Sequence, residues 1–558
     1  MATVTPLPPT AKSTAERMFP QLTPAQIARV AAHGRTRTMQ QGEVLFDVGD
    51  PAVQFLLVLS GQIESVRQLP EGDELVAVHN PGQFSGEVSL LAGRRALVRA
   101  RVSIPGEVIE LTREQLLALV QTDSEIGELL MRAFILRRVE LIARGISDAI
   151  VIGSAHCAKT LGVKEFLMRN AHPFTYIDLD HEPDVQAVFD RFHVTAADVP
   201  ILVCRGEVVL RHPTPAEIAE CLGFNAAVDD RELYDLVVVG AGPAGLAAAV
   251  YAASEGLRVL VIETRFPGGQ AGSSSKIENY LGFPTGISGQ ALAGRAYTQA
   301  QKFGAEILIA RSALRLSCTE RPYQIDVGES APLRTRTILV ATGAEYRKPL
   351  LADIPRYEGI GVYYAATFME AQLCGGEEII VIGGGNSAGQ AAVFLAQTAR
   401  HVHILVRGDG LADTMSRYLI RRIEEHPSIK LHVHTELAGL EGAEHLEHVQ
   451  WRNNVTGEIE HRDIRHVFIM AGAIPATDWL QGCLVLDAHG FILTGPDLPR
   501  ESLAPAHWAT LRSPYLLETS LPGVFAAGDV RAGNIKRVAS AVGEGSIAIS
   551  FVHRVLSE

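Results

Sequence analysis

The sequence lacks paired cysteine motifs, an excess of positive charge and a leader-like N-terminus. Its six cysteines lie far apart and none forms a CxxC, so we expect neither a disulfide framework nor a metal site. The formal net charge of −13 argues against nucleic acid as a partner, because phosphate binding needs a basic face. No apolar run with a cleavage site opens the chain, so we expect a cytoplasmic protein.

The chain is long enough for several domains. Single hydrophobic cores stop growing near about 250–300 residues, so 558 residues should form three or four domains. A hydrophobic content of 47% with 20% charged residues is typical of a soluble globular protein. We therefore expect a multidomain protein without a membrane span.

One stretch organises the rest of the chain. Residues 235–263 read DLVVVGAGPAGLAAAVYAASEGLRVLVIE, which is an apolar run, the glycines Gly240, Gly242 and Gly245, a small-residue helix and a second apolar run that ends at Glu263. A buried strand would feed a tight turn, the helix N-terminus would face a pyrophosphate, and Glu263 would hold a ribose hydroxyl. The glycines, the proline and the charged continuation argue against a membrane helix. The stretch predicts a dinucleotide site in a Rossmann-like fold.

A second nucleotide unit follows later in the chain. It reads IIVIGGGNSAGQAAVFLAQTARHVHILVR, in which Gly383, Gly385 and Ala388 form the GxGxxA version of the phosphate loop. At the position that matches Glu263 stands a valine, and Arg407 follows it. A missing acid beside an arginine favours a 2′-phosphate, hence NADPH over NADH, although Arg407 as a plain surface charge remains the alternative.

The chain from Asp229 to the C-terminus resembles low-molecular-weight thioredoxin reductase. The resemblance rests on these stretches, in the family's order: Pro267-Gly-Gly-Gln270, Ile277-Glu-Asn-Tyr-Leu-Gly-Phe-Pro284, Ile338-Leu-Val-Ala-Thr-Gly343, Gly523-Val-Phe-Ala-Ala-Gly-Asp529 and Arg537-Val-Ala-Ser-Ala-Val-Gly-Glu-Gly545. It implies two Rossmann-like α/β domains, with an FAD-binding domain in two segments (229–348 and 473–558) around an NAD(P)H-binding domain (349–472). It also implies a homodimer.

The resemblance further implies which residues hold the cofactor. In the family these stretches line the flavin and its ribityl chain or open the helix that faces the isoalloxazine. The positions carried over are Gly269, Gln270, Asn279, Thr342, Gly343, Asp529, Arg537, Val538 and Ala539. In the family the NADPH domain also swings on a two-stranded hinge, which would lie here near Pro349 and residues 471–475.

The sequence departs from the family where the family keeps its redox dithiol. Thioredoxin reductases carry a CxxC after a Gly-Val strand, and here the strand continues so that Ala365 and Phe368 stand at the two thiol positions. Neither side chain can exchange a disulfide, so the usual relay is absent. Of the family's HRRxxxR pattern only Arg407 remains. An insertion at residues 494–516, with Trp508 and Tyr515, either covers the flavin or forms a surface loop.

Residues 1–146 show short alternating runs with regular turn signals, followed by helical periodicity. This predicts a β-barrel or jelly-roll-like domain. The segment resembles a cyclic-nucleotide-binding domain through residues 45–51, 57–62 and 82–91, which implies that Gly86 and Glu87 hold phosphate and ribose. An ungapped match places Ala96 at the family's phosphate arginine. The open alternatives are that Arg94, Arg95 or Arg99 takes over the charge, or that these arginines form a solvated face; cyclic nucleotide binding is left open.

Residues 147–228 begin a new α/β pattern with the order βαβαββα. It resembles a glutaredoxin or thioredoxin-like domain, with Cys157 at the opening of the first helix and Val199-Pro200 at the cis-proline position. A thiol at a helix N-terminus should have a lowered pKa and act as a nucleophile. Thr160 replaces the second cysteine, so the domain is either a monothiol site or a spacer without redox function.

We therefore expect an NADPH-dependent FAD oxidoreductase in which the protein orients two cofactors and excludes water. The electron acceptor, a small molecule or a protein, is open. One route leads to Cys157, by analogy with alkyl hydroperoxide reductase flavoproteins, and another leads to a quinone, oxygen, a ferredoxin or a flavodoxin. The rival hypothesis is a redox sensor that a cyclic nucleotide controls through the N-terminal domain.

Overall fold

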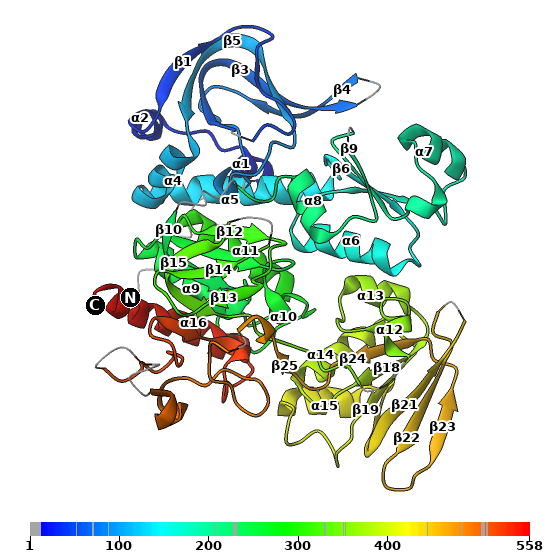
Figure 1. Ribbon diagram of the computed structural model, residues 1–558. Helices are drawn as coiled ribbons and strands as arrows, with labels where there is room; N and C mark the ends of the chain where they lie inside the picture. Colours follow the sequence, from blue (N-terminus) through cyan, green and yellow to red (C-terminus); the bar gives the residue numbers. More distant parts are fainter. Residues whose placement is uncertain are drawn as a thin grey trace, which may run out of the picture.

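The structure is a computed structural model in which sheet-containing units follow one another along the chain (Figure 1). It describes residues 13–51, 53–69, 72–87, 89–206, 208–226, 232–328, 331–349, 351, 353–443, 445–480, 482–503, 508 and 512–558. The N-terminal sheet lies at the top of Figure 1, and helix α5 runs beneath it, above the largest sheet of the molecule.

The N-terminal domain is built on an antiparallel sheet in the order β1-β5-β3-β4, with β2 on β5. Its elements are α1 (Thr14–Met18), α2 (Pro24–Ala31), β1 (Arg35–Met39), β2 (Val44–Phe46), β3 (Phe55–Leu69), β4 (Gly72–His79), α3 (Ser89–Ala92), β5 (Arg99–Leu111), α4 (Arg113–Thr122) and α5 (Ser124–Ala143). The rings of Phe55, Phe84 and Phe134 pack together where the sheet meets α5. Ser13 caps α1 where the described part of the chain begins; the first 12 residues lie outside the described part.

The central domain has a four-stranded sheet in the order β7-β6-β8-β9. Its elements are β6 (Ala149–Gly153), α6 (Ala158–Arg169), β7 (Thr175–Asp178), α7 (Val185–Phe192), the 3-10 turn η1 (Ala196–Asp198), β8 (Ile201–Cys204), β9 (Val208–Arg211) and α8 (Pro215–Cys221). β7 pairs parallel with β6, whereas β8 pairs antiparallel with it. The order of elements agrees with the expected βαβαββα, and the Val199–Pro200 peptide bond is cis.

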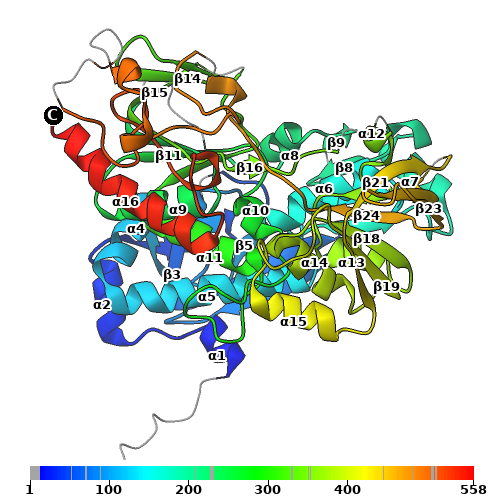
Figure 2. The ribbon, with the colours of Figure 1, turned by 90° about the horizontal axis from the view of Figure 1, so that it is seen from below.

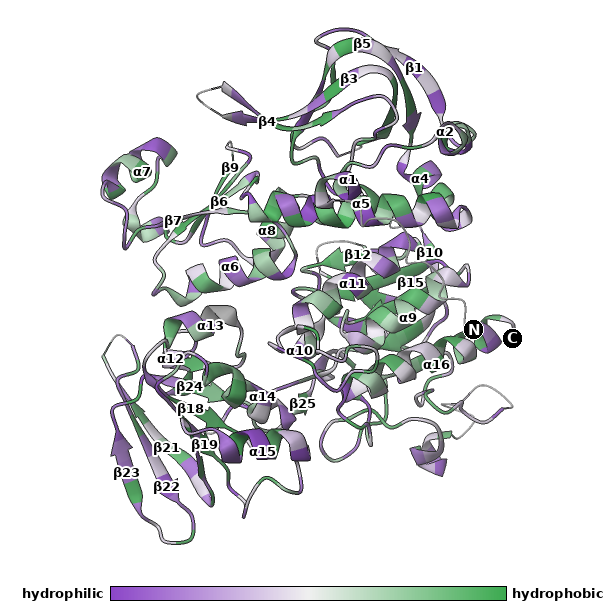
Figure 3. Cartoon of the chain, turned by 180° about the vertical axis from the view of Figure 1, so that it is seen from behind, coloured by the Kyte–Doolittle hydropathy of each residue, from purple (hydrophilic) through white to green (hydrophobic). Residues whose placement is uncertain are grey.

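The next unit, the large-sheet domain, carries a seven-stranded sheet in the order β12-β11-β10-β15-β14-β13, with β26 on β15. Its elements are β10 (Leu233–Val239), α9 (Pro243–Ser254), β11 (Val259–Glu263), α10 (Gly269–Gly272), α11 (Gly289–Lys302), β12 (Glu306–Ile309), β13 (Arg315–Ser317), β14 (Tyr323–Asp326), β15 (Leu333–Val340), η2 (Asp478–Leu480), η3 (Gly495–Asp497), η4 (Arg500–Leu503), β26 (Val524–Ala526), η5 (Gly528–Val530) and α16 (Val538–Leu556). Figure 3 shows hydrophobic residues concentrated on β10, β15 and α9, as expected for buried parallel strands.

An inserted domain interrupts the large-sheet domain. It has a parallel sheet in the order β17-β24-β18-β19-β20 and a separate antiparallel sheet β21-β22-β23. Its elements are α12 (Ile354–Tyr357), β17 (Val362–Tyr363), α13 (Phe368–Leu373), β18 (Glu378–Ile382), α14 (Asn386–Leu395), β19 (His401–Leu405), α15 (Arg417–Glu425), β20 (Ile429–His432), β21 (Thr435–Glu441), β22 (His448–Asn453), β23 (Ile459–Arg462) and β24 (His466–Ile469). The short strands β16 (Ala344–Glu345) and β25 (Ile474–Pro475) pair antiparallel where the chain enters and leaves the domain, close to the expected hinge.

Helix α6 of the central domain spans both later domains. At its C-terminal end, Nη2 of Arg169 donates to the carbonyl of Gly269 at 3.1 Å, in the large-sheet domain. At its N-terminal end, Ala158 lies against Gly359 of the inserted domain, so closely that a Cβ on Gly359 would come within 2.7 Å of the Ala158 Cβ. In Figure 1 this helix accordingly lies between the large-sheet domain and α13. Helix α6 thus contacts both domains at positions away from the hinge strands β16 and β25.

The expectation that the cysteines form no disulfides is wrong. Cys204 is bonded to Cys221, and Cys318 is bonded to Cys483, at a sequence separation of 165 residues. The fold brings these residues together: Cys318 directly follows β13, and Cys483 lies in the loop after η2, where its Sγ contacts the Leu316 carbonyl. Tertiary packing of this kind leaves no CxxC-like spacing in the sequence.

Within the described residues, the helices include none with the length and apolarity needed to cross a membrane.

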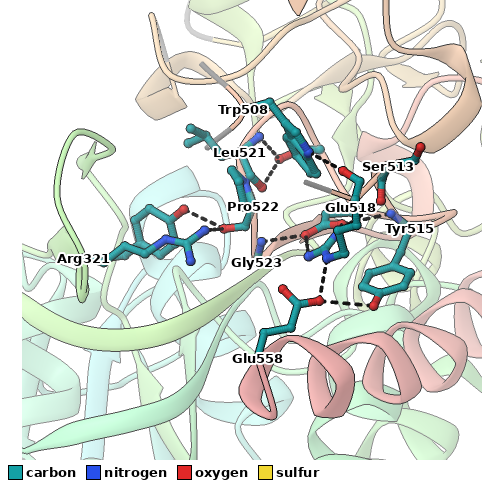
Figure 4. Close-up of polar contacts among 12 residues, drawn as sticks. Arg321, Trp508, Ser513, Tyr515, Glu518, Leu521, Pro522, Gly523 and Glu558 are labelled. Carbon is teal, nitrogen blue, oxygen red and sulfur yellow. Dashed lines mark hydrogen bonds and ion pairs between the residues drawn. The ribbon is translucent and has the colours of Figure 1, made fainter. Parts of the chain in front are cut away.

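The insertion at residues 494–516 packs against the far end of α16, not its N-terminus. Glu518 is fully buried and accepts hydrogen bonds from Arg512 and from the backbone N–H of Tyr515 and Gly523 (Figure 4). Arg512 also pairs with Glu558, and the Tyr515 ring stacks on Phe551. Because α16 has 19 residues, its ends lie about 28 Å apart. The described part of the insertion therefore packs against the C-terminal end of α16.

Candidate functional site

The first glycine loop joins β10 to α9 and is closed by contacts that only glycine allows. Gly240 has a φ of 105°, and a Cβ there would overlap the carbonyl oxygen of Ala341. A Cβ on Gly245 would overlap the carbonyl oxygen of Gly240, whereas a Cβ on Gly242 would meet nothing within 4 Å. The loop thus has no room for a side chain at Gly240 or Gly245, whereas it is open at Gly242, the N-cap of α9. This cradle fits a pyrophosphate on a helix N-terminus.

Glu263 ends β11 beside this loop. Its Oε2 accepts from the backbone N–H of Ala241 at 2.8 Å, and its Oε1 accepts from that of Arg265 at 3.0 Å. Burial raises the pKa of Glu263, and the backbone donors and the nearby Arg169 guanidinium oppose this shift. Each carboxylate oxygen has a further lone pair, so Glu263 can hold the loop and still accept from a ribose hydroxyl.

The predicted flavin-lining residues lie around the same loop. A Cβ on Gly269 would come 3.1 Å from the Cα of Gly242, so the turn at Gly269 lies directly against the phosphate loop, while Gln270 next to it is exposed. Asn279 is exposed. Thr342 donates to the carbonyl of Ala476 at 2.9 Å, and Gly343 has a φ of 70°. These placements are compatible with the predicted contacts to FAD.

Asp529 and the last helix, α16, follow strand β26, which is the neighbour of β15 in the sheet. Asp529 is in η5, directly after β26, and burial raises the pKa of its carboxyl, with Glu544 adding to the effect and Lys536 opposing it. Arg537 is the N-cap of α16, whose first turn contains Val538 and Ala539. In Figure 2, α16 runs alongside α9, and the two helices are in contact. Helices α9 and α16 thus pack side by side.

The second glycine loop joins β18 to α14 and repeats the geometry of the first. Gly383 has a φ of 140°, and a Cβ there would lie 2.6 Å from the carbonyl oxygen of Met470. Gly385 is the N-cap of α14 with nothing within 4 Å of its Cβ position, and Ala388 is fully buried under the loop. Arg407 is exposed just after β19. The loop fits a second dinucleotide, and Arg407 lies exposed at the end of the strand that follows it.

A small cleft lies where the large-sheet and inserted domains face each other. Its walls come from residues 270 and 273–275 on one side and from residues including Tyr364, Ala365, Ser387 and Met470 on the other. The position of the family's first relay thiol thus faces the segment predicted to line the flavin. All the residues that line this cleft are uncharged.

Cys157 is a partly exposed thiol at the N-cap of α6. Its domain meets the inserted domain at Ala158 and Gly359, but Cys157 is not among the residues that line the cleft at Ala365. Cys374 is the other unpaired thiol of the described residues, and burial raises its pKa to about 11. In the described part of the chain, no cluster of three or more metal-ligating side chains is present.

The three arginines named as candidates for the missing phosphate charge, Arg94, Arg95 and Arg99, each contact another part of the chain. Arg94 donates to the carbonyl of Asn170 at 3.2 Å and to the Tyr297 hydroxyl at 2.9 Å. Arg99 is paired with Asp47, and Arg95 lies against Gly223. Gly86 has a φ of 99°, and Glu87 lies 3.6 Å from an Arg138 nitrogen. Arg94 and Arg95 reach into other domains, and Arg99 is held within its own; one-dimensional spacing could not show these contacts.

Some residues of the site were missed from the sequence. Arg169 contacts Gly269 and lies near Glu263, although it belongs to the central domain. Tyr346 lines the cleft, is close to Asp529, and burial raises its pKa. Neither residue lies in a motif, so only the three-dimensional contacts identify them.

Comparison with known proteins covers two parts of the chain. A family described as pyridine nucleotide-disulphide oxidoreductase matches residues 234–545, and a cyclic nucleotide-binding domain matches residues 36–123. The chain is 32% identical over 331 residues to a thioredoxin reductase of Ureaplasma parvum, covering 59% of this chain and 98% of that protein. It is 31% identical over 346 residues to an alkyl hydroperoxide reductase component of Escherichia coli, covering 61% of each.

Solved structures agree with the sequence comparison. Lactococcus lactis thioredoxin reductase in its FR conformation has a TM-score of 0.52 at 27% identity, covering 58% of this chain and 99% of that one. T. acidophilum thioredoxin reductase has a TM-score of 0.51 at 28% identity, with the same coverage. The similarity therefore spans nearly the full length of these two structures.

Proposed function

Because the chain belongs to the pyridine nucleotide-disulphide oxidoreductase family, and is thus an NADPH-dependent flavin oxidoreductase, we propose that it reduces a small neutral acceptor without a dithiol beside the flavin. FAD supplies the hydride-accepting and electron-donating chemistry when bound. The chain's own residues bind and orient the two cofactors: Gly240, Gly242, Gly245 and Glu263 hold one, and Gly383, Gly385, Ala388 and Arg407 hold the other. Gly269, Gln270, Asn279, Thr342, Gly343, Asp529 and the α16 residues Arg537, Val538 and Ala539 complete the flavin site.

The observation that carries this proposal is Ala365 in the interdomain cleft. A methyl group there cannot form a thiolate, so the protein offers no intramolecular relay at the place where its relatives' motif would lie. The cleft is lined by hydroxyl, amide and apolar groups without a charge. Hydroxyl and amide groups hydrogen-bond carbonyl oxygens, so the chemistry of this lining suits a quinone better than a charged acceptor.

A steady-state screen tests the proposal. The purified protein is expected to be yellow and to be bleached by NADPH. NADPH oxidation is then compared with a water-soluble quinone, a small disulfide and thioredoxin as acceptors. We expect the quinone to give the highest turnover. Turnover with disulfides that exceeds turnover with every quinone contradicts the proposal, and so does a protein that takes up no flavin.

The route through Cys157 is separable from this one. A lone thiol cannot complete a dithiol–disulfide cycle by itself, and Cys157 lies outside the cleft at Ala365. We therefore expect Cys157→Ser to leave quinone reduction unchanged. Loss of turnover in this variant on any acceptor assigns the electrons to Cys157.

A second function, control of the reductase by the N-terminal domain, is favoured by a series of hydrogen bonds. Arg94 donates to the Asn170 carbonyl, the Asn170 amide donates to the Arg265 carbonyl at 3.2 Å, and the Arg265 N–H donates to Glu263. The nucleotide-binding-like domain thus contacts the residue predicted to hold the FAD ribose through two intermediates. Such a connection is only a spatial argument until coupling is measured.

The matched test replaces Arg94 and, as a control, Arg113 of the same domain. Arg94→Met removes the connection to the other domains, whereas Arg113→Met removes only a hydrogen bond to Leu91 within the N-terminal domain. We expect Arg94→Met to change the rate of NADPH oxidation by about threefold or more, the size of typical coupling energies, and Arg113→Met to leave it unchanged. Equal rates in both variants and the wild type contradict control through this contact.

A further inference from the structure

A deep cleft lies inside the N-terminal domain, between its sheet and helix α5. It encloses a volume of about 170 Å³, and since about 10–15 Å³ of such space holds one water molecule, the cleft has room for a small organic molecule. Its walls are mainly apolar, with Phe19, Phe46, Val76, Leu97 and Leu141 among them. The cleft is therefore suited to a small ligand with an apolar body.

A buried arginine from α5 lines this cleft. Arg137 is 6% exposed and lies between the rings of Phe19 and Phe84, at 4.8 and 4.7 Å from their centroids. Its Nε donates to the Met18 carbonyl at 2.9 Å and its Nη1 to the Gly86 carbonyl at 2.7 Å. Its Nη2 is buried and has no hydrogen-bond partner within the described chain.

A second unpartnered polar atom lines the same cleft. His79 is 3% exposed, and its Nε2 lies 3.2 Å from the hydroxyl oxygen of Ser65. Its Nδ1 is buried without a partner among the residues that the structure describes. Burial lowers the pKa of His79 to about 3, with the charge of Arg137 adding to the shift, so the ring is neutral at physiological pH. A neutral imidazole can donate from Nδ1.

A buried cation with an unpartnered donor is unfavourable unless something meets it. Burial lowers the pKa of Arg137 to about 9, and the Glu87 carboxylate only partly offsets this. Arg94 and Arg95 also line the cleft, but both terminal nitrogens of Arg94 donate to other domains, to the Asn170 carbonyl and the Tyr297 hydroxyl. Helix α5 thus supplies the terminal guanidinium nitrogen, Nη2 of Arg137, that is buried without a hydrogen-bond partner among the described residues.

We propose that the cleft binds an amphipathic organic anion whose compact acidic group contacts Arg137 and His79 and whose body lies along the apolar wall. The acidic group completes the hydrogen bonds of Arg137 Nη2 and His79 Nδ1, and the body covers side chains such as Phe46, Val76 and Leu97. A carboxylate suits the two unpartnered donors, because an ionised carboxylate has two oxygens that accept hydrogen bonds and no group that donates one. This binding site does not depend on the identity of the electron acceptor.

Calorimetry with the full-length, flavin-containing protein tests the proposal, with decanoate as the probe and cAMP and cGMP as separate arms. We expect decanoate to bind once per chain and the two cyclic nucleotides to bind more weakly. Arg137→Met keeps the length of the side chain without its charge and should weaken decanoate binding at least tenfold. Arg132→Met, on the exposed face of the same helix, is the matched control and should change it less than about twofold.

Arg137 also holds two carbonyl groups of its own domain, so His79→Phe serves as a second variant. It keeps an aromatic ring beside Phe19 and removes Nδ1, and a weakening of about threefold or more is expected. Absence of decanoate binding to the wild type overturns the proposal, as does equal affinity in wild type and both variants. Cyclic nucleotide binding that is tighter than decanoate and unchanged in Arg137→Met also overturns it. Flavin content and the Kd are measured independently, so failure here leaves the proposed reductase function untouched.

Discussion

The two glycine loops of this protein share a backbone and differ in what stands beside them. Gly240 and Gly383 both have a positive φ. A Cβ at either position would overlap a backbone carbonyl oxygen, that of Ala341 or that of Met470. The first loop, however, has Glu263 beside it, which accepts from two backbone N–H groups, and the turn at Gly269, to which Arg169 of another domain donates. The second loop ends beside an exposed Arg407.

This difference teaches how one fold serves two kinds of ligand. The first loop is covered by α6 and by the turn at Gly269, which suits a cofactor that stays bound. Beside the second loop, Thr414 donates to the Gly384 carbonyl, and Arg407 is exposed at the end of the second strand, which suits a cosubstrate whose phosphate meets a single cation and leaves at each turnover. Three substitutions break or sharpen this comparison, and a labelling experiment examines the rest of the molecule.

The largest effect is expected from Gly245→Ala in the first loop. The added methyl group overlaps the carbonyl oxygen of Gly240, and overpacking of this kind costs on the order of 1–3 kcal/mol. We expect the purified variant to hold less than about a tenth of the wild-type flavin, measured by absorbance. Gly294→Ala on α11 meets nothing within 4 Å and is the control. Full flavin content in Gly245→Ala contradicts the assignment of this loop.

The matching change in the second loop is Gly383→Ala. Its Cβ would lie 2.6 Å from the Met470 carbonyl oxygen and the residue has a positive φ, so the loop must distort. Flavin content should stay near the wild-type value, because the first loop is untouched, while kcat/KM for NADPH should fall by about 100-fold. Loss of flavin in this variant would show that the two loops are not independent.

A smaller effect is expected from Arg407→Glu. A charge-assisted hydrogen bond to a phosphate contributes about 1.5–3 kcal/mol, so kcat/KM for NADPH should fall about 10- to 100-fold while that for NADH changes little. Arg421→Glu, at an exposed position on α15, supplies the same change of charge away from the loop. Equal losses with NADPH and NADH, or equal losses in both variants, contradict a 2′-phosphate contact.

The smallest effect concerns thiols away from both loops. Burial raises the pKa of Cys374 to about 11, so at pH 8 this group stays protonated, and only as the pH rises toward 11 does its thiolate form. With four cysteines in disulfides, a thiol reagent at pH 8 should modify Cys157 quickly and Cys374 slowly. Mass spectrometry of the modified chain identifies the sites. Rapid labelling of Cys374 would show that its environment is more open than described.

The features predictable from the sequence are those that depend on local backbone demands. The glycine loops, Glu263 and Ala365 were identified because a tight turn, a strand end and a motif position are each visible within a few residues. The disulfide between Cys318 and Cys483 was missed, because 165 residues separate its ends. The engagement of Arg94 with Tyr297 and the burial of Arg137 were missed for the same reason: which cation is free depends on contacts between distant elements.

An anaerobic titration with NADPH tests the central claim most directly. If no dithiol communicates with the flavin, the flavin absorbance should be bleached completely by about one equivalent of NADPH per flavin, because each NADPH delivers one electron pair. A relay disulfide at the flavin would take up a second pair, and the end point would then lie near two equivalents. An end point at about one equivalent is the predicted result; an end point at about two, with two new thiols, would contradict the account.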